Sequence, residues 1–520
     1  MDVDYDFVIV GSGFGGSVSA YRLSEKGYRV LVLEKGRRWK PEQFPKTNWN
    51  LRKWMWLPFF RFFGFFKLTF MKHVAILSGV GVGGGSLVYG NTLPRPPDPF
   101  FYSGNWAGIL DWKSELEPYY REAERMLGAV ANPKFGDADL ALGSVAQSYK
   151  KQGEFEPTRV GIYFGEPEKE VPDPYFQGAG PSRTGCTFCG ACMTGCRFDA
   201  KNTLDKNYLY LAEKNGVEII AEKKVKHLEP MNGQNGRKGY RISFTDSTRI
   251  WKRSGSVTSG GVVLSGGVLG TVRLLMDMKR GDMDGLSDRI GDFIRTNNES
   301  LVLVHAAEKQ KDFSKGVAIG SIFPPDEHTH VEAVRYGSGS GFWKLMGVPM
   351  VHGESVLARV CRLIGNFFRR PLPWLRSYFS RNFARESFIL LIMQHLESTL
   401  KFRRGKWRLN SDLSTGKAPS AMMQVARDLA SATAREVNGN AFVMATEAIT
   451  ATPTTAHILG GCVIGQSREE GVIDSEQRVF GYENLYICDG SAISSNPGVN
   501  PALTITAMTE RVMSRISHKK

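Results

Sequence analysis

The segment FVIVGSGFGGSVSAYRLSEKGYRVLVLE, residues 7–34, decides the fold. Residues 7–10 form a short, mostly β-branched run that predicts a strand, and the glycine-rich residues 11–16 end it. A helical pattern follows over residues 17–26, and residues 30–33 predict a second strand. A strand, a G-x-G-x-x-G loop, a helix and a second strand in this order are typical of the βαβ unit that binds a dinucleotide.

Four residues of this unit have distinct expected roles. Gly11 allows the tight turn, Gly13 lets a pyrophosphate approach the backbone, and Gly16 packs the helix on the strand. The phosphates would lie at the helix N-terminus, and Glu34 is placed to hold the ribose hydroxyls. An acidic residue there disfavours NADP but does not separate FAD from NAD. The alternative is a tight turn in an unrelated α/β protein.

Two further glycine-rich loops favour FAD over NAD. Residues 79–86 read GVGVGGGS, and an apolar run at 262–265 leads into GGVLG at 266–270. An extended flavin needs close backbone approach at several places, and glycine is the residue that permits it. A single NAD would need only the first loop.

The C-terminal part of the chain carries the most diagnostic pattern. Residues 455–462 read TAHILGGC, and a predicted strand follows at 485–487. After it come DGS at 489–491 and NPGVNP at 496–501. Residues 501–515 predict a helix with Pro501 at its first position and Asn500 as its N-cap. The N-terminus of such a helix, aimed at a flavin, would stabilise negative charge on the reduced ring.

With these motifs the chain resembles the glucose–methanol–choline (GMC) family of FAD-dependent oxidoreductases, and within it the bacterial cholesterol oxidase-like branch. The likeness covers most of the chain. It implies a Rossmann-type α/β FAD-binding domain and oxidation of a hydrophobic alcohol, with hydride passing to flavin N5. A 3-hydroxysterol is the leading substrate. A long-chain aliphatic alcohol is the second, and a catalytically silent membrane-attached flavoprotein is the third interpretation.

The resemblance also assigns residues. It implies that His457 and Asn500 contact the substrate hydroxyl beside the flavin, and that a carboxylate of the substrate domain, Glu332, acts as a base. A histidine suits proton removal and an oriented amide positions the oxygen. A structural histidine and a solvated surface glutamate are the alternatives. Besides Gly11, Gly13, Gly16 and Glu34, the expected FAD contacts are Gly83, Gly84, Ser86, Asn91, Gly266, Asp489, Gly490 and Pro501.

Motifs of the FAD-binding domain lie at both ends of the chain, so we expect that domain to be discontinuous. We assign residues 1–100, 180–305 and 451–520 to it. Residues 101–179 and 306–450 are expected to form a substrate-binding cap domain of the α+β class with an antiparallel sheet.

Cys186, Cys189, Cys192 and Cys196 have the spacing of half a ferredoxin motif. Arg197 replaces the usual proline, and a ferredoxin's fourth cysteine ligates a different cluster. An iron–sulfur cluster that passes flavin electrons to an acceptor protein or quinone, a tetrahedral zinc site, and free or disulfide-bonded thiols all stay open. With a cluster the enzyme would be a dehydrogenase, and without one dioxygen could take the electrons.

Two segments mix aromatic and basic residues. Residues 51–70 hold nine aromatic residues and four cations within a stretch, 43–97, that has no Asp or Glu. Residues 355–385 hold seven arginines, no acid and several aromatic residues. Rings with cations suit the interface of an anionic membrane, where a water-insoluble substrate could enter a pocket. The alternative is that the rings pack against the core or line a lid.

Composition fits these expectations. The net charge of +15 over 520 residues favours an anionic partner, and we find no nucleic-acid-binding motif. No run of about 18 uncharged apolar residues predicts a membrane span. The N-terminus lacks the basic and apolar regions of a secretory signal, and four cysteines within eleven residues are atypical of a secreted disulfide framework. We therefore expect a cytoplasmic protein attached peripherally to a membrane.

Overall fold

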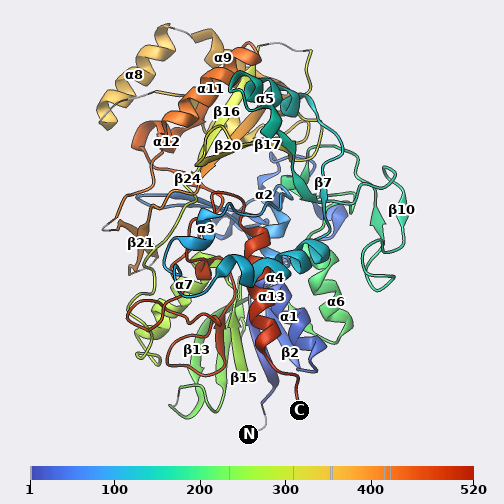
Figure 1. Cartoon of the computed structure of the whole chain (residues 1–520), viewed down its shortest axis with the longest axis vertical. Helices are drawn as coiled ribbons and strands as arrows, with labels where there is room; N and C mark the ends of the chain where they lie inside the picture. Colours follow the sequence, from blue (N-terminus) through green and yellow to red (C-terminus); the bar gives the residue numbers. More distant parts are fainter. Residues whose placement is uncertain are drawn as a thin grey trace.

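The structure, a computed structural model, describes residues 3–520 except 234, 308–309, 352, 354, 370, 407, 415 and 422. Two seven-stranded sheets organise it, one in the lower and one in the upper half of Figure 1. The two ends of the chain lie close together below the lower sheet. The sheets differ in strand direction, and this difference follows from the way that each is connected.

The lower sheet is the Rossmann-type sheet that the N-terminal motif predicts. Its order is β12-β2-β1-β15-β14-β13, with β25 also paired to β15. The first four strands and β25 run parallel, whereas β14 and β13 are added as antiparallel neighbours. Its strands are β1 (Tyr5–Val10), β2 (Val30–Leu33), β12 (Glu218–Ile220), β13 (Lys223–Pro230), β14 (Tyr240–Asp246), β15 (Ser254–Leu264) and β25 (Leu485–Ile487).

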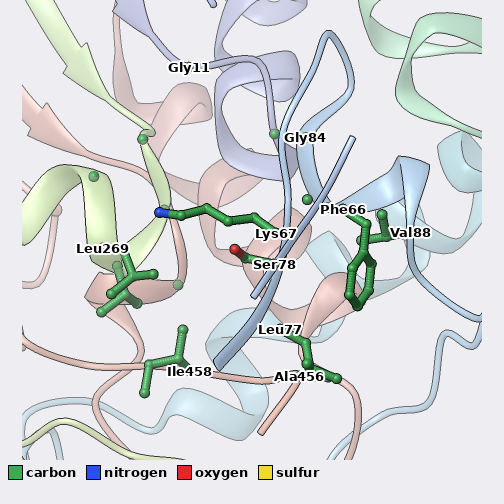
Figure 2. A pocket seen from close by; sticks show the side chains of 18 of the residues that line it. Gly11, Phe66, Lys67, Leu77, Ser78, Gly84, Val88, Leu269, Ala456 and Ile458 are labelled. Atoms are coloured by element: carbon green, nitrogen blue, oxygen red, sulfur yellow. The ribbon is translucent and has the colours of Figure 1, made fainter. Parts of the chain in front are cut away.

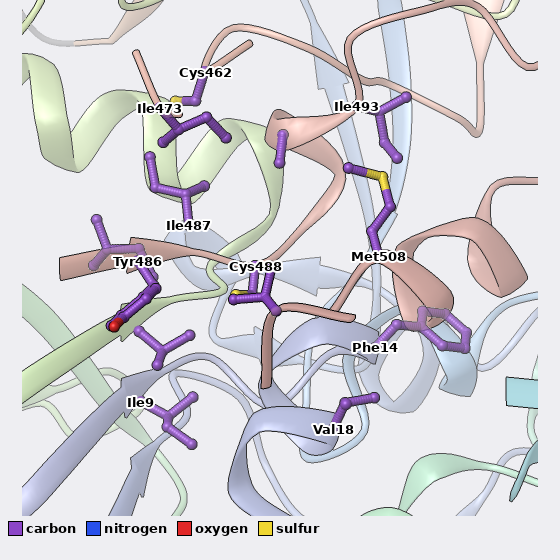
Figure 3. Packing of buried hydrophobic residues seen from close by; sticks show 14 of the residues in the cluster. Ile9, Phe14, Val18, Cys462, Ile473, Tyr486, Ile487, Cys488, Ile493 and Met508 are labelled. Carbon is purple, nitrogen blue, oxygen red and sulfur yellow. The ribbon is translucent and has the colours of Figure 1, made fainter. Parts of the chain in front are cut away.

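Helices bury the central strands from both sides, as a parallel sheet requires. Helix α1 begins three residues earlier than the sequence predicts, at Phe14, because the glycine loop leads directly into its first turn. In the core of Figure 3, Ile487 of the sheet lies beside Ile473 and Cys462, and Val18 of α1 and Met508 of α13 belong to the same buried cluster. The helices of this half are α1 (Phe14–Glu25), α4 (Trp112–Leu127), α6 (Tyr208–Lys214), α7 (Gly267–Lys279) and α13 (Ala502–Arg515).

The upper sheet is antiparallel, with the order β19-β23-β16-β20-β18-β17-β8. Side chains of its central strands alternate between two faces. Val302 and Leu390 pack on one face under the helices α5 (Asp137–Ser148) and α11 (Gln424–Glu436). Leu301 and Leu391 face the other way, toward the lower sheet. The strands are β8 (Glu156–Pro157), β16 (Ser300–Ala306), β17 (Ile319–Phe323), β18 (Thr329–Val334), β19 (Gly347–Pro349), β20 (Ser387–Gln394) and β23 (Gly439–Met444).

Two elements, helix α4 and strand β16, pack with the other domain than the one to which the sequence assigned them. Helix α4 belongs to the segment 101–179 that we assigned to the cap domain, yet its buried residues share the core of the parallel sheet. Strand β16 belongs to the segment 180–305 that we assigned to the FAD domain, yet it pairs with β20 and β23. Core packing therefore moves residues 112–127 toward the lower half and residues 300–306 toward the upper half.

Shorter elements connect the two halves and carry the aromatic segments. Among the described residues, no helix is long and apolar enough to cross a membrane. Helix α8 projects at the outer edge of the upper half in Figure 1, with α9 beside it. These elements are α2 (Leu51–Trp54), β3 (Trp56–Leu57), β4 (Phe62–Phe63), β5 (Phe66–Phe70), β6 (Ala75–Gly79), α3 (Pro99–Tyr102), β7 (Ala129–Ala131), β9 (Arg159–Gly161), β10 (Glu170–Val171), β11 (Arg183–Thr184), α8 (Val356–Arg369), α9 (Pro371–Phe379), α10 (Phe383–Glu386), β21 (Leu400–Arg404), β22 (Leu409–Leu413), α12 (Ala445–Thr450) and β24 (Thr454–Thr455).

Candidate active site

A cavity of about 650 Å³ lies between the two sheets. Its lower wall is made by the three glycine-rich loops, and its upper wall by apolar side chains of the antiparallel sheet. Figure 2 shows Lys67 and Ser78 reaching into it from β5 and β6, with Leu269 of α7 and Ile458 on the other side. One continuous space therefore joins the dinucleotide-binding loops to an apolar chamber.

The first glycine loop fits a cofactor at the lower wall. Gly11 has φ +101°, and a Cβ there would lie 2.3 Å from the backbone oxygen of Ser265, so only glycine fits. Gly16 packs in the same tight way against Gly11, as expected for contact between helix and strand. Gly13 instead faces open space and lines the cavity. The loop thus leaves room at the N-terminus of α1, where phosphate groups bind favourably.

The structure places most, but not all, of the predicted FAD contacts on this cavity. Gly83 and Ser86 do not line it, because the Ser86 hydroxyl donates to the Gly83 oxygen at 2.7 Å and accepts from the Leu204 amide at 3.1 Å. Gly16 and Asn91 also lie behind the wall. The residues that do line it are Gly11, Gly13, Glu34, Gly84, Gly266, Asp489, Gly490 and Pro501.

Asn91 shows an unsatisfied polar group beside the cavity. It is buried with a positive φ, between the lining residues Gly90 and Thr92. Neither polar atom of its side-chain amide has a hydrogen-bond partner among the described residues. Buried amides rarely lack partners, but Asn91 lies behind the cavity wall, so its contact with FAD stays a prediction.

Charge at the Glu34 end of the cavity also fits an anionic cofactor. Glu34 accepts from the amides of Ser12 at 3.1 Å and Gly36 at 2.8 Å, so its carboxylate is fixed at the wall. Lys35, Lys67 and Arg273 line the same region. Burial, together with the repulsion of Lys35, Lys224 and Arg273, lowers the pKa of Lys67 to about 7. A bound pyrophosphate would relieve this repulsion.

The three residues that sequence reasoning assigned to the reaction lie together. The Asn500 amide nitrogen is 3.4 Å from Nε2 of His457 and 3.4 Å from a carboxylate oxygen of Glu332. His457 follows β24, Glu332 lies on β18, and Asn500 precedes α13, so three distant segments meet here. Glu332 is completely buried, which excludes the alternative of a solvated surface glutamate.

Sequence reasoning missed two residues of this cluster. Glu299, just before β16, has Oε1 2.5 Å from Nδ1 of His457. His330 has Nε2 3.0 Å from the other carboxylate oxygen of Glu332. The i, i+2 spacing of His330 and Glu332 on one strand could have revealed that these two side chains pair. No local signal marks Glu299, because its partner is 158 positions away.

The surroundings of His457 favour its charged form. Burial of the ring lowers the pKa of His457, but the adjacent Glu299 carboxylate, with a smaller effect of Glu332, outweighs burial and holds the pKa above its usual value. The imidazole is therefore a stronger proton acceptor than an isolated one. This environment suits a group that takes a proton from an alcohol.

Asn500 does not cap α13, which corrects the sequence-based prediction. The helix begins at Ala502 with Pro501 at the N-cap position, and no side chain caps it. The Asn500 side chain instead points to His457 and Glu332. Pro501 lines the cavity at this helix end.

Three of the four clustered cysteines, Cys186, Cys192 and Cys196, belong to one small hydrophobic cluster. Among the described residues, the only group of three or more ligands with atoms within 4.8 Å of one another is His227, Glu229 and Asp282, so no three thiols converge. Burial, with the neighbouring Cys189, raises the pKa of Cys192 to about 11. All four are free thiols, and no three of them lie close enough together to bind a single zinc ion. The sulfurs that hold an iron–sulfur cluster lie farther apart than those around one ion, so the cluster expected from the spacing stays a prediction.

Comparison with known proteins identifies the family and several relatives of this chain. Models described as GMC oxidoreductase match residues 181–282 and 406–509, and one described as a NAD(P)-binding Rossmann-like domain matches residues 9–39. A cholesterol oxidase of Acinetobacter baumannii is 44% identical over 99% of this chain and 95% of its own length. One of Mycobacterium tuberculosis is also 44% identical, over 99% and 91%.

More distant relatives share the fold over the whole chain. A long-chain-alcohol oxidase of Arabidopsis thaliana, FAO4B, is 23% identical over 98% of this chain and 67% of its own length. The crystal structure of pyridoxine 4-oxidase from Mesorbium loti superposes with a TM-score of 0.61 over 99% of both chains, at 16% identity. The latter likeness shows the fold alone.

The fold, the cavity and these relatives define an FAD-dependent oxidoreductase that acts on alcohols. The chain belongs to the GMC oxidoreductase family, in its cholesterol oxidase-like group.

Proposed function

We propose that this protein oxidises the hydroxyl group of a 3-hydroxysterol to a ketone. The observation that carries the proposal is the shape of the cavity: an apolar chamber that ends at the buried cluster of His457, Asn500 and Glu332. Six apolar residues of the antiparallel sheet form much of the chamber wall, namely Leu301, Leu303, Ile319, Val334, Ile389 and Leu391. Such a wall suits a rigid hydrocarbon with one polar end.

The polar cluster supplies the proton chemistry. FAD, held by the glycine loops, supplies a two-electron acceptor for the hydride of the alcohol carbon. His457 takes the hydroxyl proton at Nε2, and Asn500 orients the hydroxyl oxygen. Glu332 holds the Asn500 amide in place, and it adds a negative charge that favours the protonated histidine. The apolar chamber excludes water, which strengthens these electrostatic effects.

The 44% identical relatives in two organisms are cholesterol oxidases, which supports a sterol over other alcohols. The second candidate is a long-chain aliphatic alcohol. The more distant Arabidopsis relative, a long-chain-alcohol oxidase, favours it. A flexible chain and a fused ring system would both satisfy an apolar wall, so the substrate must be tested directly.

We also propose that dioxygen accepts the electrons. The relatives named above are oxidases, which supports dioxygen as the acceptor. This assignment routes no electron through the cysteine cluster. The alternative is transfer to an acceptor protein or quinone, through an iron–sulfur cluster on Cys186, Cys189, Cys192 and Cys196.

Peripheral attachment to an anionic membrane is part of the proposal. Phe59 is 90% exposed beside Trp56 and Pro58, which line the cavity, and Phe368 on α8 is 76% exposed. Helix α8 packs on β19, whose Gly347 also lines the cavity. Exposed rings and cations next to the chamber would let a lipid substrate enter from the bilayer. The cytoplasmic location expected from the sequence stays a prediction.

The two aromatic segments share one connecting element. Trp54 of the first packs edge to face on Trp343, with ring centroids 6.0 Å apart. The next residue, Lys344, donates to the backbone oxygen of Ser380, just after α9, at 3.0 Å. Both segments therefore contact the same short helix, Phe342–Leu345.

The test is product analysis under air. The purified protein is incubated with cholesterol, with its 3-keto counterpart as a control that has no hydroxyl, and with a long-chain primary alcohol. We expect the 3-ketone and an equal amount of hydrogen peroxide from cholesterol alone. An aldehyde from the primary alcohol with an unchanged sterol would replace the proposal by the second candidate.

A further inference from the structure

Glu299 contacts the side of His457 that faces away from the substrate. Its side chain is completely buried, and it comes from the residues that lead into β16. One carboxylate oxygen lies 2.5 Å from Nδ1 of His457, and the other accepts the backbone amide of Ala456 at 2.7 Å. The carboxylate is therefore fixed to the backbone next to the histidine that it contacts.

This distance places a proton on Nδ1. Two atoms that both carry only lone pairs would repel one another at 2.5 Å. The two groups form an ion pair without regular hydrogen-bond geometry, and we infer that Nδ1 carries the proton that this pair requires. In the uncharged ring the second nitrogen, Nε2, then has a free lone pair. The histidine would be the Nδ1–H tautomer, as in other sites where a carboxylate orients an imidazole.

Asn500 gives independent support for this tautomer. Its amide nitrogen lies 3.4 Å from the Glu332 carboxylate, which only accepts hydrogen bonds, so the NH2 group and not the oxygen must face Glu332. The same nitrogen lies 3.4 Å from Nε2 of His457. A donor facing Nε2 requires Nε2 to be the acceptor.

We propose that Glu299 is a positioning residue that makes Nε2 of His457 the proton acceptor of the reaction and stabilises the imidazolium that results. The inference rests on the alcohol oxidation proposed above. In that step the alcohol O–H bond breaks and its proton forms a bond to Nε2. The C–H bond breaks as hydride, so the alcohol loses two electrons to the flavin and becomes a carbonyl compound. Glu299 itself keeps its negative charge.

Several other charged groups surround this pair. On β18, Glu332 contacts the Asn500 amide, which in turn contacts His457, and His330 contacts Glu332. Glu447 of α12 lies behind Glu299, where it accepts from the hydroxyl of Ser300 at 3.5 Å. Among the described residues, the carboxylate that contacts Nδ1 is that of Glu299, so we expect the effect on that nitrogen to come from Glu299 and not from Glu332 or Glu447.

The decisive experiment observes the ring directly and needs no substrate. The FAD-bound protein is labelled with ¹⁵N-histidine, and His457→Ala identifies the His457 signals among the nine histidines. We expect the Nδ1–H tautomer at high pH. We expect the titration midpoint of His457 to move to lower pH in Glu299→Gln, which keeps the shape but removes the charge. Glu447→Gln, a buried carboxylate nearby, should leave the midpoint unchanged.

Kinetics provide the second readout. A protonated His457 cannot accept a proton, so the rate of flavin reduction falls below its pKa, and loss of the Glu299 charge should shift this acid limb to lower pH. The plateau rate should fall about 100-fold in Glu299→Gln, and Glu299→Asp should recover part of it. An Nε2–H tautomer, or the same midpoint in wild type and Glu299→Gln, would overturn the inference. Failure of sterols to reduce the flavin would contradict the proposed function alone, because the NMR result does not depend on it.

Discussion

The imidazole of His457 lies between two buried carboxylates, one on the Nδ1 side of the ring and one on the Nε2 side. Glu299 contacts Nδ1 directly, while Glu332 acts through Asn500. The motif around His457 predicts its role, and the structure brings Asn500 and Glu332 to it as the resemblance implies. Glu299 could not be found from sequence, since a pairing across such a distance along the chain exists only after β16 and β24 are placed side by side.

Replacing His457 by alanine tests the proton acceptor. We expect the rate of flavin reduction by an alcohol to fall at least about 1,000-fold, because no other described base lies at Nε2. FAD should stay bound, since the glycine loops are untouched; its visible absorbance reports this. His227→Ala, on the surface strand β13, serves as the control, and a variant at His457 with near wild-type reduction would rule out the assigned role.

Glu447 predicts a pH dependence of stability. Burial raises the pKa of this carboxyl to about 8, against about 4.3 in the unfolded chain. Between these values the folded state holds a proton that the unfolded state lacks, so stability falls as the pH rises through this window. Glu447→Gln stays neutral, and its Tm relative to wild type should rise from pH 5 to pH 9. The exposed Glu436→Gln should show no such trend; a parallel trend in both variants would disprove the cause.

Secondary-structure elements were predicted best where local chemistry fixes them. The first βαβ unit follows from its glycines and from apolar runs that are buried on both faces, and the structure confirms it. The prediction of a helix after Pro501 was right. The prediction that Asn500 caps it was wrong, because the Asn500 side chain contacts His457 and Glu332 instead. The spacing of the cysteines left an iron–sulfur cluster, a zinc site and free or disulfide-bonded thiols open. The structure has free thiols, and no three of them converge on one ion.

Two glycines of the first loop should respond differently to alanine. Gly11→Ala places a Cβ 2.3 Å from the Ser265 oxygen at φ +101°, so we expect a loss of stability of several kcal/mol, measured by thermal unfolding. Gly13→Ala meets no atom within 4 Å of its new Cβ, so the fold should remain. Its methyl group enters the cavity, and FAD affinity should fall at least about tenfold. Tight FAD binding by a well-folded Gly13→Ala protein would show that the pyrophosphate binds elsewhere.

Helices α8 and α9 predict binding to anionic membranes. Phe368→Ser with Phe379→Ser removes two exposed rings, and Arg369→Glu with Arg376→Glu reverses two exposed charges. Each pair should reduce sedimentation with phosphatidylserine-containing vesicles at least about tenfold, while oxidation of a detergent-dispersed substrate is kept. Trp251→Ser is the matched control, since Trp251 is 88% exposed in the turn between β14 and β15. Equal losses in the control would argue against a specific surface.

The whole molecule builds one reaction chamber from two unlike sheets. The parallel sheet provides glycine loops for FAD, and the antiparallel sheet provides an apolar wall above them. The cluster at their junction draws on segments near residues 299, 332, 457 and 500. The glycine motifs predicted the parallel sheet and the family resemblance implied the antiparallel one, but the path of the chain between them could not be predicted. Core packing places α4 and β16 across the expected domain limits.

The most direct test of the central claim is a single anaerobic mixing experiment with the FAD-bound protein. Cholesterol dispersed in detergent is added while the absorbance of oxidised flavin is followed. We expect the flavin to bleach, cholesterol deuterated at C3 to slow the bleaching several-fold, and air to restore the colour with formation of hydrogen peroxide. Flavin that stays oxidised with cholesterol, in a protein whose cavity binds FAD normally, would contradict the account.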